Sequence, residues 1–228
     1  MADLPYRRAL IVGAGSGISA AVARMLAEEG VRVALAARNT EKLAPLAQAI
    51  TAPTFAADAA DPASVAQLFR ALDENFGVPD IVVYNPSARV RGSLLDLDPD
   101  AVRNALAVSA FGGFLVAQQA ARRMVPNGLG AILFTGASAS VKGYTLSAAF
   151  AMGKFALRGL AQSAARELGP KGIHVAHIVI DGGVRTAADP SDATLDPEAI
   201  AQTYLDLLRQ PRSAWSLEVE LRPWVETF

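Results

Sequence analysis

The sequence predicts a doubly wound α/β fold, in which a parallel sheet carries helices on both faces. Short apolar runs alternate with longer segments of helical periodicity, and Gly or Pro bounds most of the runs. A run that is apolar throughout is typical of a strand buried on both faces of a parallel sheet. Parallel neighbours need crossover connections, and the helical segments supply them with right-handed geometry.

The expected strands are the short apolar runs of this pattern. In chain order they are Ala9–Val12, Val31–Ala36, Thr54–Ala57, Ile81–Tyr84, Ala131–Thr135 and Ile173–Ile180. Near the C-terminal end, Leu217-Glu-Val-Glu-Leu alternates apolar and charged residues and is expected to add a last strand.

The helices are predicted from an apolar stripe on one face together with start and stop residues. Asp caps a helix N-terminus, and Pro is tolerated in the first turn because its missing N–H has no partner there. The predicted helices are Ile18–Glu29, one opening at Asp61-Pro62, one running from Asp98-Pro99 to about Met124, and Ser147–Leu168.

Length and composition indicate one domain over residues 1–228, since the chain is 52% hydrophobic and 19% charged. The 21 basic and 22 acidic residues give no net field for nucleic acid or an anionic membrane. There is no cysteine, which excludes disulfides and thiolate metal sites, and no cluster of His and carboxylates indicates a metal. No signal peptide or membrane-spanning run is recognisable, so a cytoplasmic location is expected.

A glycine-rich turn follows the first strand, and a helix begins directly after it. Small residues let the backbone approach a pyrophosphate, while the helix N-terminus presents unpaired N–H groups and a partial positive charge. An ordinary tight turn is the alternative, but the placement between strand and helix favours a dinucleotide site. The predicted contacts are Gly13, Gly15, Ser16, Gly17 and Ile18.

The residues after the second and third strands bear on the choice of dinucleotide. An acidic residue after the second strand would favour NAD, whereas this chain has Ala37 followed by Arg38. A guanidinium is suited to bidentate contact with a 2′-phosphate, so NADP is predicted, with NAD as the alternative. Asp58, after the third strand, either meets the adenine amino group or caps the turn before Asp61.

Lys154 stands alone among Ala, Phe, Leu and Met on a predicted helix. Burying its ammonium without a partner would be costly, and the hydroxyl pair of a nicotinamide ribose is such a partner. With the glycine-rich turn, Arg38, Asp58 and the segment Arg166–Val175 in this order, the chain resembles the short-chain dehydrogenase/reductase family over nearly all of its length.

The resemblance implies a nicotinamide cofactor and an active site of Asn, Ser, Tyr and Lys, in which the tyrosine is the general acid. It also implies cofactor contacts at Asn85, Lys154, Gly182 and Val184. Three of the four active-site positions are altered here. The family's Asn falls on Ser109, its Ser on Ala137 or, after a one-residue shift, on Ser138, its Tyr on Phe150, and its Lys on Lys154.

Phe150 removes proton delivery because a phenyl ring has no O–H. General acid catalysis is typically worth about 10²–10⁴-fold, so the loss is large without abolishing hydride transfer. Three groups are candidates for compensation. Ser138 polarises the carbonyl, Lys154 protonates it directly or through water, or Tyr144 reaches the vacated position from upstream in the same loop region.

The predicted function is therefore NADP(H)-dependent transfer of hydride between nicotinamide and a small carbonyl or alcohol, with an atypical proton donor. The alternative is a dinucleotide-binding protein with little or no turnover, acting as a sensor or structural partner. The two long helices are apolar on more than one face, which predicts a homodimer or homotetramer. Val184–Leu195 resembles a substrate lid but is short and gives little hydrophobic cover. The pocket is therefore expected to be open, or to be completed by Trp215, Trp224 or another subunit.

Overall fold

The computed structural model describes residues 4–185, 187 and 189–226. It confirms the doubly wound α/β fold: seven strands form one sheet in the order β3-β2-β1-β4-β5-β6-β7, and every neighbouring pair is parallel. The strands are β1 Arg8–Val12, β2 Arg32–Ala37, β3 Thr54–Ala56, β4 Ile81–Tyr84, β5 Gly130–Thr135, β6 Ile173–Ile180 and β7 Glu218–Leu221.

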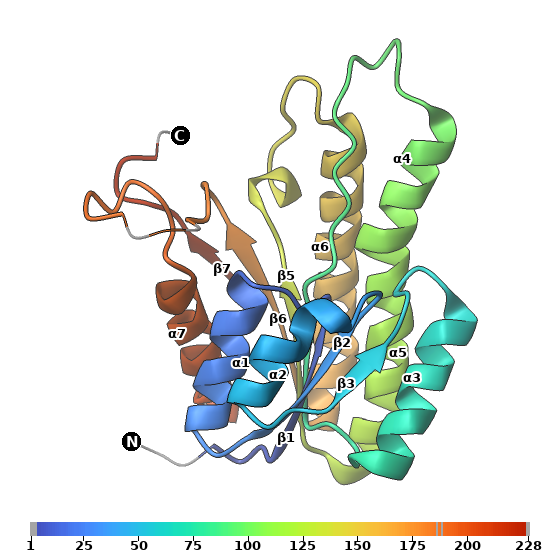
Figure 1. The fold of residues 1–228 in the computed structure, drawn as a ribbon, viewed down its shortest axis with the longest axis vertical. Helices are drawn as coiled ribbons and strands as arrows, with labels where there is room; N and C mark the ends of the chain where they lie inside the picture. The colour runs from blue at the N-terminus through green and yellow to red at the C-terminus, as the bar shows by residue number, and fades with distance from the viewer. Residues whose placement is uncertain (1–3, 186, 188, 227–228) are drawn as a thin grey trace.

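Helices cover both faces of the sheet (Figure 1). The first face carries α1 Ile18–Glu28, α2 Ala44–Ala49, which follows the short turn η1 Glu41–Leu43, and α7 Pro197–Leu208. The opposite face carries α3 Pro62–Asn75, α4 Pro99–Leu106, α5 Gly112–Met124 and α6 Ala148–Leu168.

Successive side chains of β1 alternate between two hydrophobic clusters, one on each face of the sheet. Ala9 and Ile11 pack with α1 and α7, whereas Leu10 and Val12 pack with α3, α5 and α6. Successive side chains of a strand point to opposite faces, so a strand covered on both sides must be apolar at every position. All four residues are buried. This explains why unbroken apolar runs located the strands.

Two of the predicted helix starts have the expected cap. Asp61 accepts hydrogen bonds from the backbone N–H groups of Ala63 and Ser64. Asp98 does the same for Asp100 and Ala101. The same Asp-Pro signal stands at Asp196-Pro197, where it opens α7, a helix that sequence reasoning did not identify.

The long helix predicted from Pro99 to Met124 is interrupted, which corrects that expectation. Residues Ala107–Phe111 form a π-helical segment between α4 and α5. The hydroxyl of Tyr84, at the end of β4, donates to the carbonyl of Val108 at 2.5 Å. A Cβ at Gly112 would lie 2.4 Å from that hydroxyl oxygen. The phenol thus occupies the space beside the helix, and the wider π turn accommodates it.

By length and composition alone, the helical stretch Pro99–Asn127 is apolar enough to cross a membrane. In the structure it packs against α3, α6 and β5 of the folded domain. It therefore serves as a covering helix of the sheet.

Removing the cap of α3 tests the local part of this account. Asp61→Ala is expected to lower the free energy of unfolding by about 1 kcal/mol, because two N–H groups lose their acceptor. Asp61→Asn, which keeps a side-chain oxygen, serves as the control and should lose only a fraction of that. Urea denaturation followed by circular dichroism measures both. Equal losses in the two variants would show that the cap contributes nothing.

Candidate active site

The carboxyl ends of β1 and β4 lie side by side where the strand order reverses, the position at which α/β sheets bind ligands. The glycine-rich turn occupies this position. Gly13 has φ +75°, and a Cβ there would lie 2.6 Å from the nitrogen of Pro86. At Gly15 and Gly17 a Cβ would meet nothing within 4 Å. Gly13 therefore serves the packing of the turn, whereas Gly15 and Gly17 leave open space for a ligand.

The start of α1 suits an anionic ligand. The cap residue Gly17 has no side chain to accept hydrogen bonds from the first N–H groups of the helix, and the first turn contains no acidic residue. Its first N–H groups and the positive end of the helix dipole therefore face the open side of the turn. The residues present fit the pyrophosphate of a dinucleotide.

Ser19 stands where a third glycine would be expected and braces the turn. Its buried hydroxyl donates to the carbonyl of Gly13 at 3.1 Å and accepts from the side-chain amide of Asn85 at 2.7 Å. The bond holds Asn85, a predicted cofactor contact, between the turn and the end of β4. Sequence reasoning did not include Ser19 in the site, because its two partners are brought together only by the sheet.

Arg38 and Asp58 line one cavity of about 400 Å³ together with Gly13 and Asn85. This places the groups predicted for the adenosine end beside the glycine-rich turn. Asp58 also accepts a hydrogen bond from the backbone of Ala60 at 2.9 Å, so it shapes its own turn as well. Both roles considered for Asp58 are compatible with this position.

A second cavity, of about 330 Å³, brings together the residues predicted for the nicotinamide end. The start of α1, the loop after β4 and the ends of β5 and β6 contribute to it, and α6 forms a further wall. Its predicted residues are Ile18, Asn85, Phe150, Lys154, Gly182 and Val184. Their convergence follows from the parallel arrangement, which directs every strand toward the same edge.

Lys154 is buried at 2% exposure, and its ammonium donates to the carbonyl of Thr135, at the end of β5, at 2.7 Å. Burial lowers the pKa of Lys154 to about 8, and the nearby positive charge of Arg89 adds to this effect. Desolvation disfavours the charged form of a lysine, so the proton is held less tightly than on an exposed lysine. Lys154 can therefore exchange a proton close to neutral pH.

Phe150 lies one helical turn before Lys154, and the Lys154 nitrogen is 5.9 Å from the centre of its ring. The guanidinium of Arg89 also lies over this ring, 4.5 Å from its centre. Arg89 comes from the loop after β4 and was not among the predicted residues. A cation–π contact between residues so distant in sequence leaves no local signal.

Ser138 lines a third cavity, of about 450 Å³, on the other side of Phe150. Ala137 and Tyr144 line it as well, and Tyr144 is 48% exposed at its rim. The hydroxyl of Ser138 and the phenol of Tyr144 thus share a cavity with the ring that lacks one.

Ser109 lies apart from these cavities. It sits in the π-helical segment, fully buried, and accepts a hydrogen bond from the backbone N–H of Ala88 at 3.3 Å. A Cβ at Gly153 would lie 2.8 Å from its Cβ, so the serine is enclosed beneath α6. In this position Ser109 fixes the loop that carries Arg89.

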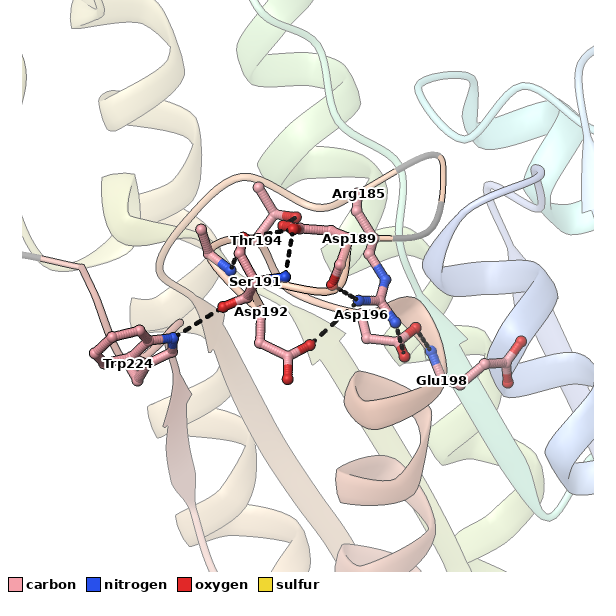
Figure 2. A network of polar contacts seen from close by, with 9 residues as sticks. Arg185, Asp189, Ser191, Asp192, Thr194, Asp196, Glu198 and Trp224 are labelled. Atoms are coloured by element: carbon pink, nitrogen blue, oxygen red, sulfur yellow. Dashed lines mark hydrogen bonds and ion pairs between the residues drawn. The ribbon is translucent and has the colours of Figure 1, made fainter.

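The segment after β6 is held by a polar network (Figure 2). Arg185 forms ion pairs with Asp192 and Asp196. Hydrogen bonds from Ser191 and Thr194 lower the pKa of Asp189 to about 2. Residues 186 and 188 of the predicted lid lie outside the described part of the chain.

Of the two tryptophans considered for completing the lid, Trp224 contacts it. The indole of Trp224 donates to the carbonyl of Ser191 at 3.2 Å (Figure 2). Trp215 instead stacks on His174, with ring centres 4.8 Å apart, at the opposite end of β6. The suggestion of Trp215 at the pocket was therefore wrong, because the parallel strand carries His174 away from the site.

An open glycine-rich turn at the switch point and a buried lysine beside it define a dinucleotide-binding oxidoreductase site. The sequence profile described as short chain dehydrogenase matches residues 7–194. The chain belongs to this family, as the resemblance predicted, and is an NAD(P)-dependent oxidoreductase.

Individual members of the family cover almost the whole chain. An uncharacterized oxidoreductase of Staphylococcus aureus strain N315 is 30% identical over an alignment of 233 residues. The alignment covers 98% of this chain and 100% of that protein. A short-chain dehydrogenase from Rhodopseudomonas palustris is 37% identical, with a TM-score of 0.84 over 96% of this chain and 99% of that one. A gluconate 5-dehydrogenase from Burkholderia cenocepacia J2315, solved with NADP and tartrate, is 26% identical, with a TM-score of 0.86 over 95% and 94% of the two chains.

Two glycine variants separate binding from folding in the turn. Gly15→Val is expected to weaken dinucleotide binding at least tenfold without changing the melting temperature, because its side chain enters the open space. Gly13→Ala is expected to destabilise the protein by about 1–2 kcal/mol or more, since φ is positive and Pro86 lies against it. Fluorescence titration with NADPH and thermal denaturation give the two readouts. Unchanged NADPH binding by Gly15→Val would contradict this assignment of the turn.

Proposed function

We propose that the protein is an NADP(H)-dependent oxidoreductase that transfers hydride between nicotinamide and a small carbonyl or alcohol, using residues 1–228 as one domain. The observation that carries the proposal is the shared cavity of Ile18, Asn85 and Lys154, which joins the dinucleotide turn to the catalytic lysine position. The bound cofactor supplies the hydride. The chain supplies orientation, exclusion of water and the proton.

The choice of NADP rests on Arg38. It lies in the same cavity as the glycine-rich turn, and β2 ends without a carboxylate that would accept from a ribose diol. The related gluconate 5-dehydrogenase was solved with NADP, which agrees with this preference. A planar guanidinium matches a 2′-phosphate through two parallel hydrogen bonds.

For the proton we propose Lys154 as the donor, directly or through a water, with Ser138 polarising the carbonyl. Phe150 has no hydroxyl, and among the described residues Lys154 is the ionisable group of this cavity whose pKa lies near neutrality. Ser138 faces the adjoining cavity on the other side of the Phe150 ring. The two groups flank the position that the missing phenol would take.

We also propose a cytoplasmic homodimer or homotetramer, formed through α5 and α6. Phe111 and Phe114 stack with ring centres 6.1 Å apart, and both remain exposed. Phe155, on α6, is exposed as well. Large apolar side chains left in water on two long helices are what a second copy would cover.

Substitution of Arg38 tests the cofactor. Arg38→Ala is expected to weaken NADPH binding by about tenfold to a hundredfold and to leave NADH binding within about twofold, because NADH has no 2′-phosphate. Fluorescence titration of both cofactors measures this. Arg70→Ala, an exposed arginine of α3, is the control and should change neither. Equal losses for NADPH and NADH would contradict recognition of the 2′-phosphate.

Phe150→Tyr tests the proton donor and the activity together. Restoring a phenolic O–H is expected to raise NADPH oxidation by at least about tenfold with a panel of small aldehydes and ketones, whereas Phe150→Leu should not. In the wild type, the rate of reduction should fall as pH rises through about 8, because Lys154 loses its proton there. The charged or titratable neighbours of Lys154 are Arg89 and His177.

A flat profile between about pH 7 and 9 would contradict Lys154 as the donor. If NADPH binds but no carbonyl is reduced by the wild type or by Phe150→Tyr, the oxidoreductase proposal fails. The protein would then be a cofactor-binding member of the family without turnover.

A further inference from the structure

The two cavities that meet at Phe150 are cationic. Arg89 lines both, Lys154 lines the first, and Arg91 lines the second. Neither is lined by a carboxylate among the residues that the structure describes. The nearby carboxylate of Asp181 is buried and already ion-paired with Arg222. The positive charge of the cavities is therefore not balanced from within the site.

Arg89 is held in place but leaves its donors free. Its guanidinium lies over the Phe150 ring at 4.5 Å, while the backbone beside it is fixed by the bond from Ala88 to Ser109. Within the described parts of the chain, no hydrogen bond or ion pair joins Arg89 to another residue. A guanidinium held by a cation–π contact keeps its N–H groups for other partners, and these form the fork that matches two oxygens of an oxyanion.

Phe150 contributes to this arrangement in two ways: it lacks a phenolic hydroxyl, and it offers an aromatic face. An aromatic face attracts a guanidinium. The ring thus holds Arg89 near the place where the family's general acid would act, although Lys154, on the same ring, repels it. Neighbouring cations in a partly buried site disfavour each other's charged form, and an anion close to both favours it.

We propose that the protein acts on small carbonyl compounds that carry a carboxylate, and that Arg89 binds this carboxylate bidentately at the edge of the Phe150 ring. The assignment of a substrate rests on the proposed oxidoreductase function. The carbonyl would then face Lys154 and Ser138. A planar carboxylate matches the two parallel N–H groups of the one guanidinium in the shared wall, and it leaves the N–H groups of Lys154 that do not bind Thr135 for the carbonyl.

The position of Arg89 favours contact with a substrate over contact with a cofactor phosphate. Arg89 also lines the cavity beyond Phe150, which none of the residues Gly13–Ile18 of the dinucleotide turn lines. Ser138 and Tyr144 line that cavity instead. Arg89 therefore faces the substrate side as well as the cofactor side.

The test uses three acids, pyruvate, acetoacetate and 4-oxopentanoate, each compared with its uncharged methyl ester. These acids vary the spacing between the carboxylate and the carbonyl. Calorimetric titration of the NADPH-loaded protein measures binding without requiring turnover, and NADPH oxidation is followed separately. At least one acid is expected to bind tenfold or more tightly than its ester.

Arg89→Gln is expected to abolish this preference, with acid binding weakened about tenfold to a hundredfold and ester binding changed less than about twofold. Arg89→Lys should recover part of the acid binding, because it keeps the charge but not the fork. Phe150→Leu should weaken acid binding as well, since it removes the face that holds the guanidinium. Arg103→Gln, at an arginine of α4 with a side chain 77% exposed, is the matched control and should behave as wild type.

Several results would overturn the proposal. These are equal binding of all acids and esters, a loss of NADPH binding in Arg89→Gln with acid binding intact, or inorganic phosphate binding more tightly than every acid. Arg89-dependent binding of an acid without NADPH oxidation would support the anion site while the oxidoreductase proposal fails. Reduction of acids and esters alike, unaffected by Arg89→Gln, would leave the oxidoreductase proposal standing and reject the anion site.

Discussion

The parallel sheet is the constraint on which the rest of the molecule depends. Because all seven strands run in one direction, their carboxyl ends meet at one edge. Segments as far apart in sequence as Gly13, Asn85, Thr135 and Gly182 therefore lie together there. The helices that make the crossovers bury both faces, so the sheet has little freedom to shift. The positions of the site residues at this edge are therefore fixed by the packing of the whole domain.

Within that frame, charge and burial set the character of the site. Lys154 is buried against a strand carbonyl, and its pKa falls to about 8 through desolvation and the nearby Arg89. The ring of Phe150 contacts both cations. Loss of the phenol therefore does not leave an empty position. It leaves an aromatic surface that seats a guanidinium, which replaces a neutral proton donor by a positive charge.

Much of the fold followed from local signals. Unbroken apolar runs predicted six of the strands, and the alternating segment 217–221 predicted the seventh, all to within one residue at each end. Asp-Pro pairs predicted the starts of α3 and α4. The π-helical interruption at Ala107–Phe111 could not be predicted from local signals, because it comes from the Tyr84 hydroxyl, which reaches the helix from a distant strand. The start of α7 at Asp196-Pro197 carries the same signal as α3 and α4, although α7 is not among the predicted helices.

By itself, the sequence determined the strand–turn–helix of the dinucleotide site, the single lysine of α6 and the absence of a hydroxyl at position 150, since each is encoded by residue type and local spacing. Only the tertiary structure decided that Ser109 lies beneath the cavities, that Ser19 braces Asn85, and that Arg89 stacks on Phe150. Those contacts join different strands and loops. The geometry of these contacts depends on how the crossover helices pack on the sheet, and local sequence periodicity does not predict that packing.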